Sequence, residues 1–558
     1  MKKPTVSHRD LGPIISIAQP VKVGPPGKGG RTSGQRRGAY HSFANIASDR
    51  KALSEKTLCK LAAVLHETVV QSANLAQSPL NSPAVGPDGT TYSGISAGYT
   101  YLFQLAGHDL LNTSISIANL LLGEGPLNLM RQPLAQRTVL GESARVCPFA
   151  YETGTNGPRL RTGMVKVQAP AGAHQPWILC APRRDLPRGA FSDSTGKPDP
   201  ATGLNVVLIP DARNDDNLLL GQVTGLFHGI ANHVAETVAA KTDPLTDVEA
   251  EMQAVMAGLW RRILREDLLA RILHPEIHQF YMAPDARRLD TAATDDRPSI
   301  EFAFAAGRLG HAMVRDRYRM NEKIPTLDLD RIIEISSSHR PQALPLLRDY
   351  VVDWSYYFPS TTGALPEGFN WAFRFGPHVA VGMQLSAAAE TPLQEGGVAV
   401  GTVARDLLRE ASGRLASVRQ ILDVVRDRAP EPGWGPDLQH LLAPGVPDRL
   451  FTDGLAAMEA AITFGGLDRL DDTERQALAA DPPLSLFLQF EAVALGDGGR
   501  TLGPLGSIIV AEAMWPAFSA RAGAAHEEIE RRAFGLVPRS MPELLDALRI
   551  HAPYLFDI

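Results

Sequence analysis

The residues that could carry chemistry begin in the stretch YTYLFQLAGHDLLNTS, residues 99–114. Gln104 precedes His108 by four residues, so the two polar side chains share one face of an otherwise apolar helix. In IPDARNDDNLLLGQ, Arg213 stands just before a second helix and is followed by acids, including Asp216. A histidine can accept a proton and then return it, and an arginine keeps its positive charge, so this set suits proton transfer beside developing negative charge.

A second group lies later in the chain. His311 ends the apolar stretch EFAFAAGRLGH, with Arg308 three residues before it. Asp406 and Arg409 occur in VARDLLRE, on a further predicted helix. A neutral imidazole is a metal ligand, and a carboxylate is a common acceptor for its second N–H.

Taken singly, each of these residues has a plain structural alternative. A lone histidine on an apolar helix face, such as His108, is more often a core residue than a catalyst. Arg213 could be a surface ion-pair partner of Asp215, and Asp406 could be an acid on a helix surface.

The elements that must position these side chains are mostly helices. Residues 1–45 form a basic arm rich in Pro and Gly, and residues 46–558 read as one large unit. The segments 123–215 and 320–395 are irregular, with a strand-like VVLIP at 206–210. Parallel βαβ alternation is absent, so we predict a mainly α fold with few short strands. Helical patterns occupy residues 51–74, 99–122, 217–240, 245–273, 298–317, 399–427, 447–464, 473–496, 506–521 and 541–549.

Composition restricts the class of protein. The chain has 558 residues, with 44% hydrophobic and 21% charged residues, which is ordinary for a globular protein. Its net charge of −6 gives no reason to expect nucleic acid or anionic membrane as a partner. Three cysteines do not make a disulfide framework, and no segment reaches the roughly 18 apolar residues of a membrane span. We therefore expect a cytoplasmic protein.

Five motifs in the correct order resemble the animal-type haem peroxidases, the superfamily that includes the cyclooxygenases, and in particular their bacterial branch. The distal-helix motif is matched by QLAGHDL, the arginine motif by RNDDN and the proximal motif by GRLGHAM. RDYVVDWSYYF at 348–358 and the long segment 483–514 resemble two further family signatures.

This resemblance implies a haem b held between the distal helix and the helix of the proximal histidine. His311 would be the axial iron ligand, with Asp406 as the acceptor for its second N–H, where the family has asparagine. His108 and Arg213 would act on hydrogen peroxide, and Gln104 would orient water or a small anion. Arg409 matches an arginine beside a haem propionate. Arg308 stands where cyclooxygenases and fatty-acid dioxygenases have a radical tyrosine, so fatty-acid oxygenation is not expected.

Two departures from the family pattern limit the cofactors. Gly107 replaces the acid that forms a haem ester, so at most one ester is expected, through Asp216. The calcium loop is represented by LAQRTVLGE, 134–142, in which Ala135 and Arg137 stand where oxygen ligands belong. We expect no calcium, and Arg137 is a candidate to pair with Asp109 instead.

We therefore expect a haem peroxidase that uses hydrogen peroxide to oxidise a small organic donor, such as a phenol, an indole or a biosynthetic intermediate, or an easily oxidised halide. The alternative is a non-catalytic haem-binding protein of the same fold. The retained Gln104, His108, Arg213 and His311 favour catalysis, whereas Gly107 and the altered calcium loop favour the alternative. Neither the physiological donor nor the oligomeric state follows from the sequence.

Overall fold

The structure is a computed structural model of the 558-residue chain. The residues that it describes are 40–43, most of 57–64, 92–114, 126–152, 158–169, 177–190, 204–240, 246–283, most of 286–290, 296–340, 343–383 apart from 378 and 381, 402–428 apart from 414, 434–460, 470–518 and 523–556.

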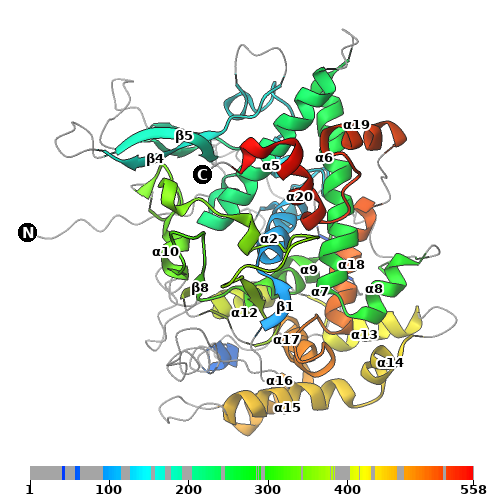
Figure 1. Ribbon diagram of the computed structural model, residues 1–558. Coiled ribbons are helices and arrows are strands. Elements are labelled where there is room, and N and C mark those ends of the chain that lie inside the picture. Colours follow the sequence, from blue (N-terminus) through cyan, green and yellow to red (C-terminus); the bar gives the residue numbers. More distant parts are fainter. Residues whose placement is uncertain are drawn as a thin grey trace, which may run out of the picture.

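Helices dominate the described residues and surround one buried helix, α2 (Gly98–Leu110), which lies near the centre of Figure 1. Tyr99, Leu102 and Ala106 of α2 are completely buried. The other α-helices are α4 (Arg137–Leu140), α5 (Leu218–Ala239), α6 (Val248–Ile263), α7 (Leu269–Ile272), α8 (Pro275–Met282), α9 (Ile300–Phe304), α10 (Leu329–Glu334), α12 (Thr402–Gly413), α13 (Val418–Asp427), α14 (Pro436–Leu442), α15 (Val446–Ala460), α16 (Asp472–Ala480), α17 (Leu484–Leu495), α18 (Pro504–Phe518), α19 (Ala524–Phe534) and α20 (Met541–His551).

Shorter helical turns connect these elements. A π-helical turn, η3 (Leu264–Leu268), joins α6 to α7 without a break. The 3-10 helices are η1 (Pro148–Ala150), η2 (Ala212–Asp215), η4 (Ala306–Met313), η6 (Arg348–Tyr350), η7 (Trp354–Tyr356) and η8 (Pro553–Leu555).

Strands in the described part of the chain form antiparallel pairs only. The pairs are β1 (Tyr92–Ser96) with β10 (Trp371–Phe373), β2 (Thr113–Ser114) with β3 (Leu127–Asn128), β4 (Gly163–Gln168) with β5 (Trp177–Asp185), β6 (Arg188–Ala190) with β7 (Leu204–Val207), and β8 (Arg317–Tyr318) with β9 (Leu327–Asp328). The predicted mainly α fold with few short strands is thus confirmed.

The helix predictions hold best where the apolar period is uninterrupted. The segments predicted at 217–240 and 245–273 are helical over nearly their whole length. The helical pattern over 473–496 forms two helices, because Pro482 and Pro483 separate α16 from α17. The helical pattern over 399–427 also forms two helices, because Ser417 begins α13 with its own capping box.

The helical stretch predicted at 298–317 is not one continuous α-helix. Ala305 leaves the helical region at φ −126° and ψ −76°, and the chain continues as the 3-10 helix η4. Gly307 and Gly310 lower helix propensity there. The predicted helix at 51–74 lies largely outside the described residues.

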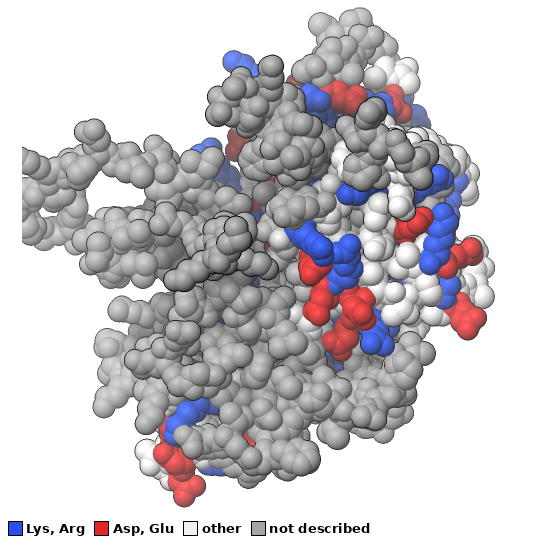
Figure 2. Space-filling model, turned by 90° about the vertical axis from the view of Figure 1, so that its left-hand side faces the viewer, with Lys and Arg blue, Asp and Glu red and all other residues white. Residues whose placement is uncertain are grey.

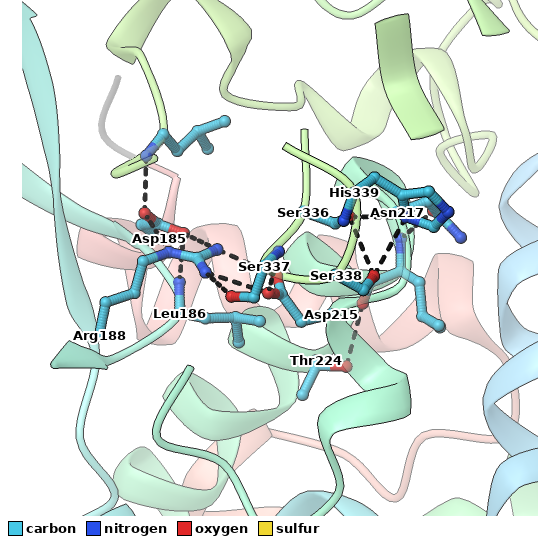
Figure 3. Close-up of polar contacts among 12 residues, drawn as sticks. Asp185, Leu186, Arg188, Asp215, Asn217, Thr224, Ser336, Ser337, Ser338 and His339 are labelled. Atoms are coloured by element: carbon cyan, nitrogen blue, oxygen red, sulfur yellow. Dashed lines mark hydrogen bonds and ion pairs between the residues drawn. The ribbon is translucent and has the colours of Figure 1, made fainter. Parts of the chain in front are cut away.

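A buried ion network ties η2 to two distant segments (Figure 3). The guanidinium of Arg188 lies between two carboxylates, at 2.9 Å from Asp185 and 3.0 Å from Asp215. These three side chains are at most 5% exposed. Arg188 also donates to Ser337 Oγ at 3.0 Å, and the backbone N–H of Ser337 donates to Asp215 at 2.9 Å. The network therefore fixes η2 against the β5–β6 connection and the loop that follows α10.

The outer surface carries charges of both signs. Figure 2 shows one face on which the described Lys and Arg side chains lie beside Asp and Glu side chains. Ion pairs within and near α10, such as Arg331 with Glu334 at 3.1 Å and Arg317 with Asp328 at 2.9 Å, are of this kind. Within the described ranges, no helix combines the length and the apolar character needed to cross a membrane.

Substitution of Arg188 by Met leaves two buried carboxylates without their cation. We expect the free energy of unfolding, measured by urea denaturation, to fall by about 3–5 kcal/mol. Arg419→Ala is the control, because its pair with Asp448 is about half exposed on both sides and should cost at most about 1 kcal/mol. Equal losses in the two variants would show that the buried network does not hold the fold together.

Candidate active site

Helix α2 brings Gln104 and His108 to one side and Asp109 to another. Asp109 is buried and accepts the backbone N–H of Gln136 at 2.7 Å and that of Thr138 at 3.3 Å. Burial raises the pKa of Asp109 to about 6, although these N–H groups oppose the shift. These hydrogen bonds to Asp109 thus hold the end of α2 against the start of α4.

Asn214 orients the ring of His108. Its side-chain Nδ2 donates to the carbonyl of Thr138 at 3.1 Å, which turns its Oδ1 toward Nδ1 of His108 at 2.9 Å. Because Oδ1 can only accept, Nδ1 of His108 must carry the hydrogen, and the lone pair of the neutral ring lies on Nε2. The free nitrogen is therefore the one that can accept a proton.

The surroundings keep His108 neutral. Burial lowers its pKa to about 4, the positive charge of Arg213 adds to that shift, and the hydrogen bond to Asn214 opposes it. At neutral pH the ring is therefore a base, and the conjugate imidazolium is a strong acid that returns its proton readily.

Arg213 lies at the carboxyl end of α2. Its guanidinium donates to the backbone carbonyls of Leu111 at 2.7 Å and His108 at 3.0 Å, and it pairs with Asp211 at 2.5 Å. Because Asp211 accepts from both Nε and Nη2, these bonds use four of the five guanidinium hydrogens and leave one on Nη1. The side chain is 39% exposed. Arg213 thus bonds to the carboxyl end of α2 and places a positive charge beside His108.

Gln104 is linked to the same turn. Asn217 donates to Gln104 Oε1 at 3.4 Å, while its own Oδ1 caps α5 by accepting the N–H of Leu220 at 2.9 Å. The segment 211–217 therefore supports both polar residues of α2 that the sequence singles out. Asp216, the predicted ester residue, is exposed at the end of η2, and the ester stays a prediction.

His311 is held on η4 by the predicted acceptor. Its Nδ1 lies 2.9 Å from Asp406 Oδ2, and the two side chains are 29% and 13% exposed. Burial opposes ionisation of Asp406, but the charge and hydrogen bond of His311, with the charges of Arg308 and Arg409, hold the pKa of its carboxyl below the usual value. An ionised acceptor fixes the hydrogen of His311 on Nδ1 and leaves Nε2 free to bind a metal.

The two histidine-bearing elements pack against each other. A Cβ added to Gly310 would lie 2.9 Å from the ring of Phe103, so η4 approaches α2 closely one residue before Gln104. A Cβ at Gly107 would meet nothing within 4 Å, so open space borders α2 beside His108. The charge of Arg308 acts on both His108 and Asp406. The predicted distal and proximal groups thus lie around one region of the molecule.

Two residues near this region were missed by the sequence reasoning. Asn214 was not singled out, although its place directly after Arg213 is a usable signal. Tyr40 had no signal, because the sequence assigns it to the arm 1–45. Its hydroxyl lies 2.7 Å from that of Thr113, just after α2, and burial raises its pKa to about 12 against the charges of Arg308 and Arg213.

The short segment 40–43 that carries Tyr40 packs against the body of the molecule. His41 lies 2.6 Å from Asp290, and the backbone N–H of Phe43 donates to Glu301 at 2.9 Å. The rest of the arm before residue 40 lies outside the described residues, and the division at residue 45 stays a prediction.

The suggested pairing of Arg137 with Asp109 is wrong. Arg137 points to Gln132 at 2.8 Å, to Gln253 at 2.6 Å and to the carbonyl oxygen of Gly141 at 3.2 Å. Backbone N–H groups satisfy Asp109 instead, so no cation is needed there to balance the hydrogen bonding. The expected lack of calcium stays a prediction.

No protein-family model matches this chain, and no curated protein matches it in sequence. Its fold does match solved structures. Peroxidase A from Dictyostelium discoideum matches with a TM-score of 0.53 at 11% identity, over 93% of this chain and 94% of that one. The fatty acid alpha-dioxygenases of Oryza sativa and Arabidopsis thaliana match with TM-scores of 0.50 and 0.52, at 11% and 9% identity, over 93% of this chain and 82% and 78% of theirs. The chain therefore has an animal haem peroxidase-like fold, which it shares with this peroxidase and with these two fatty acid alpha-dioxygenases.

The titration of His108 tests this description of the distal side. The unfolded imidazole takes up a proton near pH 6.5, whereas the buried one does so only near pH 4. Between these two pH values only the unfolded chain binds the proton. The free energy of unfolding therefore falls as the pH drops from 6.5 toward 4. Ring-carbon NMR, with the His108 signal assigned from its loss in His108→Gln, should give a midpoint of about 4.

Arg213→Gln provides the matched change, because it removes a charge that lowers the pKa of His108. The midpoint should then move upward. A wild-type midpoint near 6.5 would mean that His108 is solvated and that the distal side is not assembled as described.

Proposed function

We propose that this protein is a haem-dependent peroxidase that reduces hydrogen peroxide and oxidises a small organic donor or an easily oxidised halide. The observation that supports this most is the complementary orientation of two histidines on packed elements. His108 is turned by a neutral amide so that Nε2 is a free base, and His311 is turned by a carboxylate so that Nε2 is a free ligand.

The residues present fit a haem. His311 with Asp406 is the donor set that iron(III) haem takes on its proximal side, an imidazole whose second N–H has an anionic acceptor. Open space lies beside Gly107, where a side chain would otherwise project. Arg308 and Arg409 carry positive charge near Asp406 and suit the two propionates. When bound, haem supplies the redox-active iron at which peroxide is reduced and the donor oxidised.

The distal residues handle the protons of that reaction. Nε2 of His108 takes the proton from one peroxide oxygen and returns it to the other as water leaves. Burial and the charge of Arg213 keep the ring neutral before the reaction, so that it is ready to accept. The remaining N–H on Nη1 of Arg213 is the donor available to a polarised oxygen. Gln104, held by Asn217, presents its amide N–H₂ group to water or a small anion.

The substrate side has two features that differ from a fatty-acid oxygenase. Arg308, three residues before His311, cannot form the tyrosyl radical that such an enzyme uses at this position. Tyr40 and Thr113 bring hydroxyls to the end of α2 instead. These groups suit a small, polar donor, and we propose a phenol, an indole or a comparable biosynthetic intermediate.

Reconstitution with haem tests the roles of the two histidines separately. We expect the wild-type chain to show a Soret band and to turn over guaiacol with peroxide. His311→Ala should lose the histidine-ligated Soret spectrum. His108→Ala should keep that spectrum but react with peroxide about 10²–10⁴-fold more slowly, because it lacks the base.

The other outcomes discriminate between the proposed enzyme and its rival. A Soret band without any peroxide reaction, unchanged by His108→Ala, would favour a non-catalytic haem-binding protein. No Soret band in any preparation would exclude both. His233→Ala is a suitable control, because Nε2 of His233 donates to the backbone carbonyl of Ala533 on α19, away from the two histidines.

Asp406→Asn tests the proximal pair. A carboxylate acceptor makes the imidazole of His311 a stronger donor to iron(III), so its replacement by an amide should raise the reduction potential of the bound haem. A change of about 1.4 kcal/mol corresponds to about 59 mV for a one-electron couple, so we expect a rise of tens of millivolts in spectroelectrochemical titration. A wild-type potential equal to or above that of Asp406→Asn would contradict the assignment of Asp406.

A further inference from the structure

Helix α6 carries a stripe of small residues that leads to Arg261 near its end and to Arg265 in the following turn, η3. Ala250, Ala254 and Ala257 recur at helical spacing, and Arg261 and Arg265 follow on the same face. Two hollows, with volumes of about 490 and 380 Å³, lie along this face and meet at Arg261. Figure 1 shows α6 beside α18 and α19, which complete their walls.

Both hollows have an excess of positive charge. The first is lined by three arginines and one acid, and the second by five arginines and two acids. Their charged lining residues are Arg131, Arg137, Arg261 and Asp296 in the first, and Arg261, Arg262, Arg265, Arg531, Arg539, Glu266 and Glu527 in the second.

Some of these arginines are neutralised within the protein. Arg262 pairs with the buried Glu530 at 2.5 Å. Arg531 pairs with Glu527 at 3.2 Å, and Arg539 lies 3.4 Å from Glu266. These ion pairs compensate three of the five arginines that line the second hollow.

Arg261 and Arg265 differ from these three arginines. Among the described residues, neither has a carboxylate within ion-pair distance, and the Nε of each is buried without a hydrogen-bond partner. Arg265 contacts a protein group through its guanidinium face, 5.9 Å from the ring centre of Trp515. Burial lowers the pKa of Arg261, the charge of Arg137 adds to that shift, and the more distant carboxylates of Asp109 and Asp296 oppose it.

Arg137 adds a third uncompensated charge. Its guanidinium bonds only to neutral acceptors, among them the side chains of Gln132 and Gln253. These bonds fix its orientation but leave its charge. Arg137 of α4, Arg261 of α6 and Arg265 of η3 therefore border the two hollows, and none of the three has a carboxylate within ion-pair distance among the described residues.

From this arrangement we propose that the α6 hollows bind a small organic polyanion through its phosphate or carboxylate oxygens, with Arg261 and Arg265 as the main contacts. Guanidinium groups present paired N–H donors that match these planar or tetrahedral anions. Each hollow has the volume of a small-molecule site. The site shares no residue with the histidine pair, so the inference does not depend on the proposed peroxidase activity.

Calorimetric titration of the full-length chain tests the site directly, with inorganic pyrophosphate and citrate as separate probes at matched ionic strength. We expect saturable binding of at least one probe, weakening as salt is raised. Tighter pyrophosphate binding identifies a phosphate ligand, and tighter citrate binding identifies a carboxylate ligand. Failure of both probes to bind the wild-type chain at millimolar concentration overturns the proposal.

Variants locate the binding. The double variant Arg261→Gln with Arg265→Gln should bind the probe with at least tenfold lower affinity, because two charged hydrogen-bond donors are lost. Arg419→Gln, in an exposed ion pair elsewhere, should leave the affinity unchanged. Far-ultraviolet circular dichroism shows whether the double Gln variant folds. If it does not, the double variant Arg261→Lys with Arg265→Lys replaces it. This variant keeps both charges but removes the paired donors, so it should lose part of the affinity. Unchanged affinity in the folded double variant, Gln or Lys, overturns the site.

Discussion

Asp215 is a buried carboxylate, and much of the candidate site depends on how its charge is compensated. The guanidinium of Arg188 pairs with both Asp215 and Asp185, and the backbone N–H of Ser337 donates a further hydrogen bond to Asp215. A buried carboxylate that lost this cation would be costly, so the turn that carries it has one stable position. That turn, residues 211–217, supplies Asn214 to His108, Arg213 to the end of α2 and Asn217 to Gln104. The need to compensate the buried charge of Asp215 thus positions the residues that contact His108 and Gln104.

The two histidines show how one residue type acquires two roles. Each is fixed through Nδ1, and each leaves Nε2 free, but the partners differ in charge. A neutral amide leaves His108 a weak base whose proton is easily returned, which suits acid–base work. An ionised carboxylate makes the imidazole of His311 a stronger electron donor, which suits a metal ligand. The partner, rather than the histidine itself, distinguishes the two proposed functions.

The sequence predicted the mainly helical fold and the long helices because their apolar periods are regular, as in α5. It could not predict that His311 lies on a 3-10 helix, since the break depends on the backbone of Ala305 and the close approach of Gly310 to Phe103. The pairing of His311 with Asp406 was predicted from motif order and is present in the structure. Asn214 and Tyr40 were missed because their roles arise from contacts between distant segments, which no local pattern encodes.

The central claim is that His108 is the neutral base of a haem site whose iron ligand is His311. Its most direct test is the second-order rate constant for peroxide with the haem-loaded chain, measured by stopped flow across the acid range. If His108 is this base, the rate should stay level down to about pH 5 and fall with a midpoint near 4, the pKa of His108. This acid limb should vanish, with a uniformly low rate, in His108→Gln. A midpoint near 6.5, or a profile that His108→Gln leaves unchanged, would contradict the central claim.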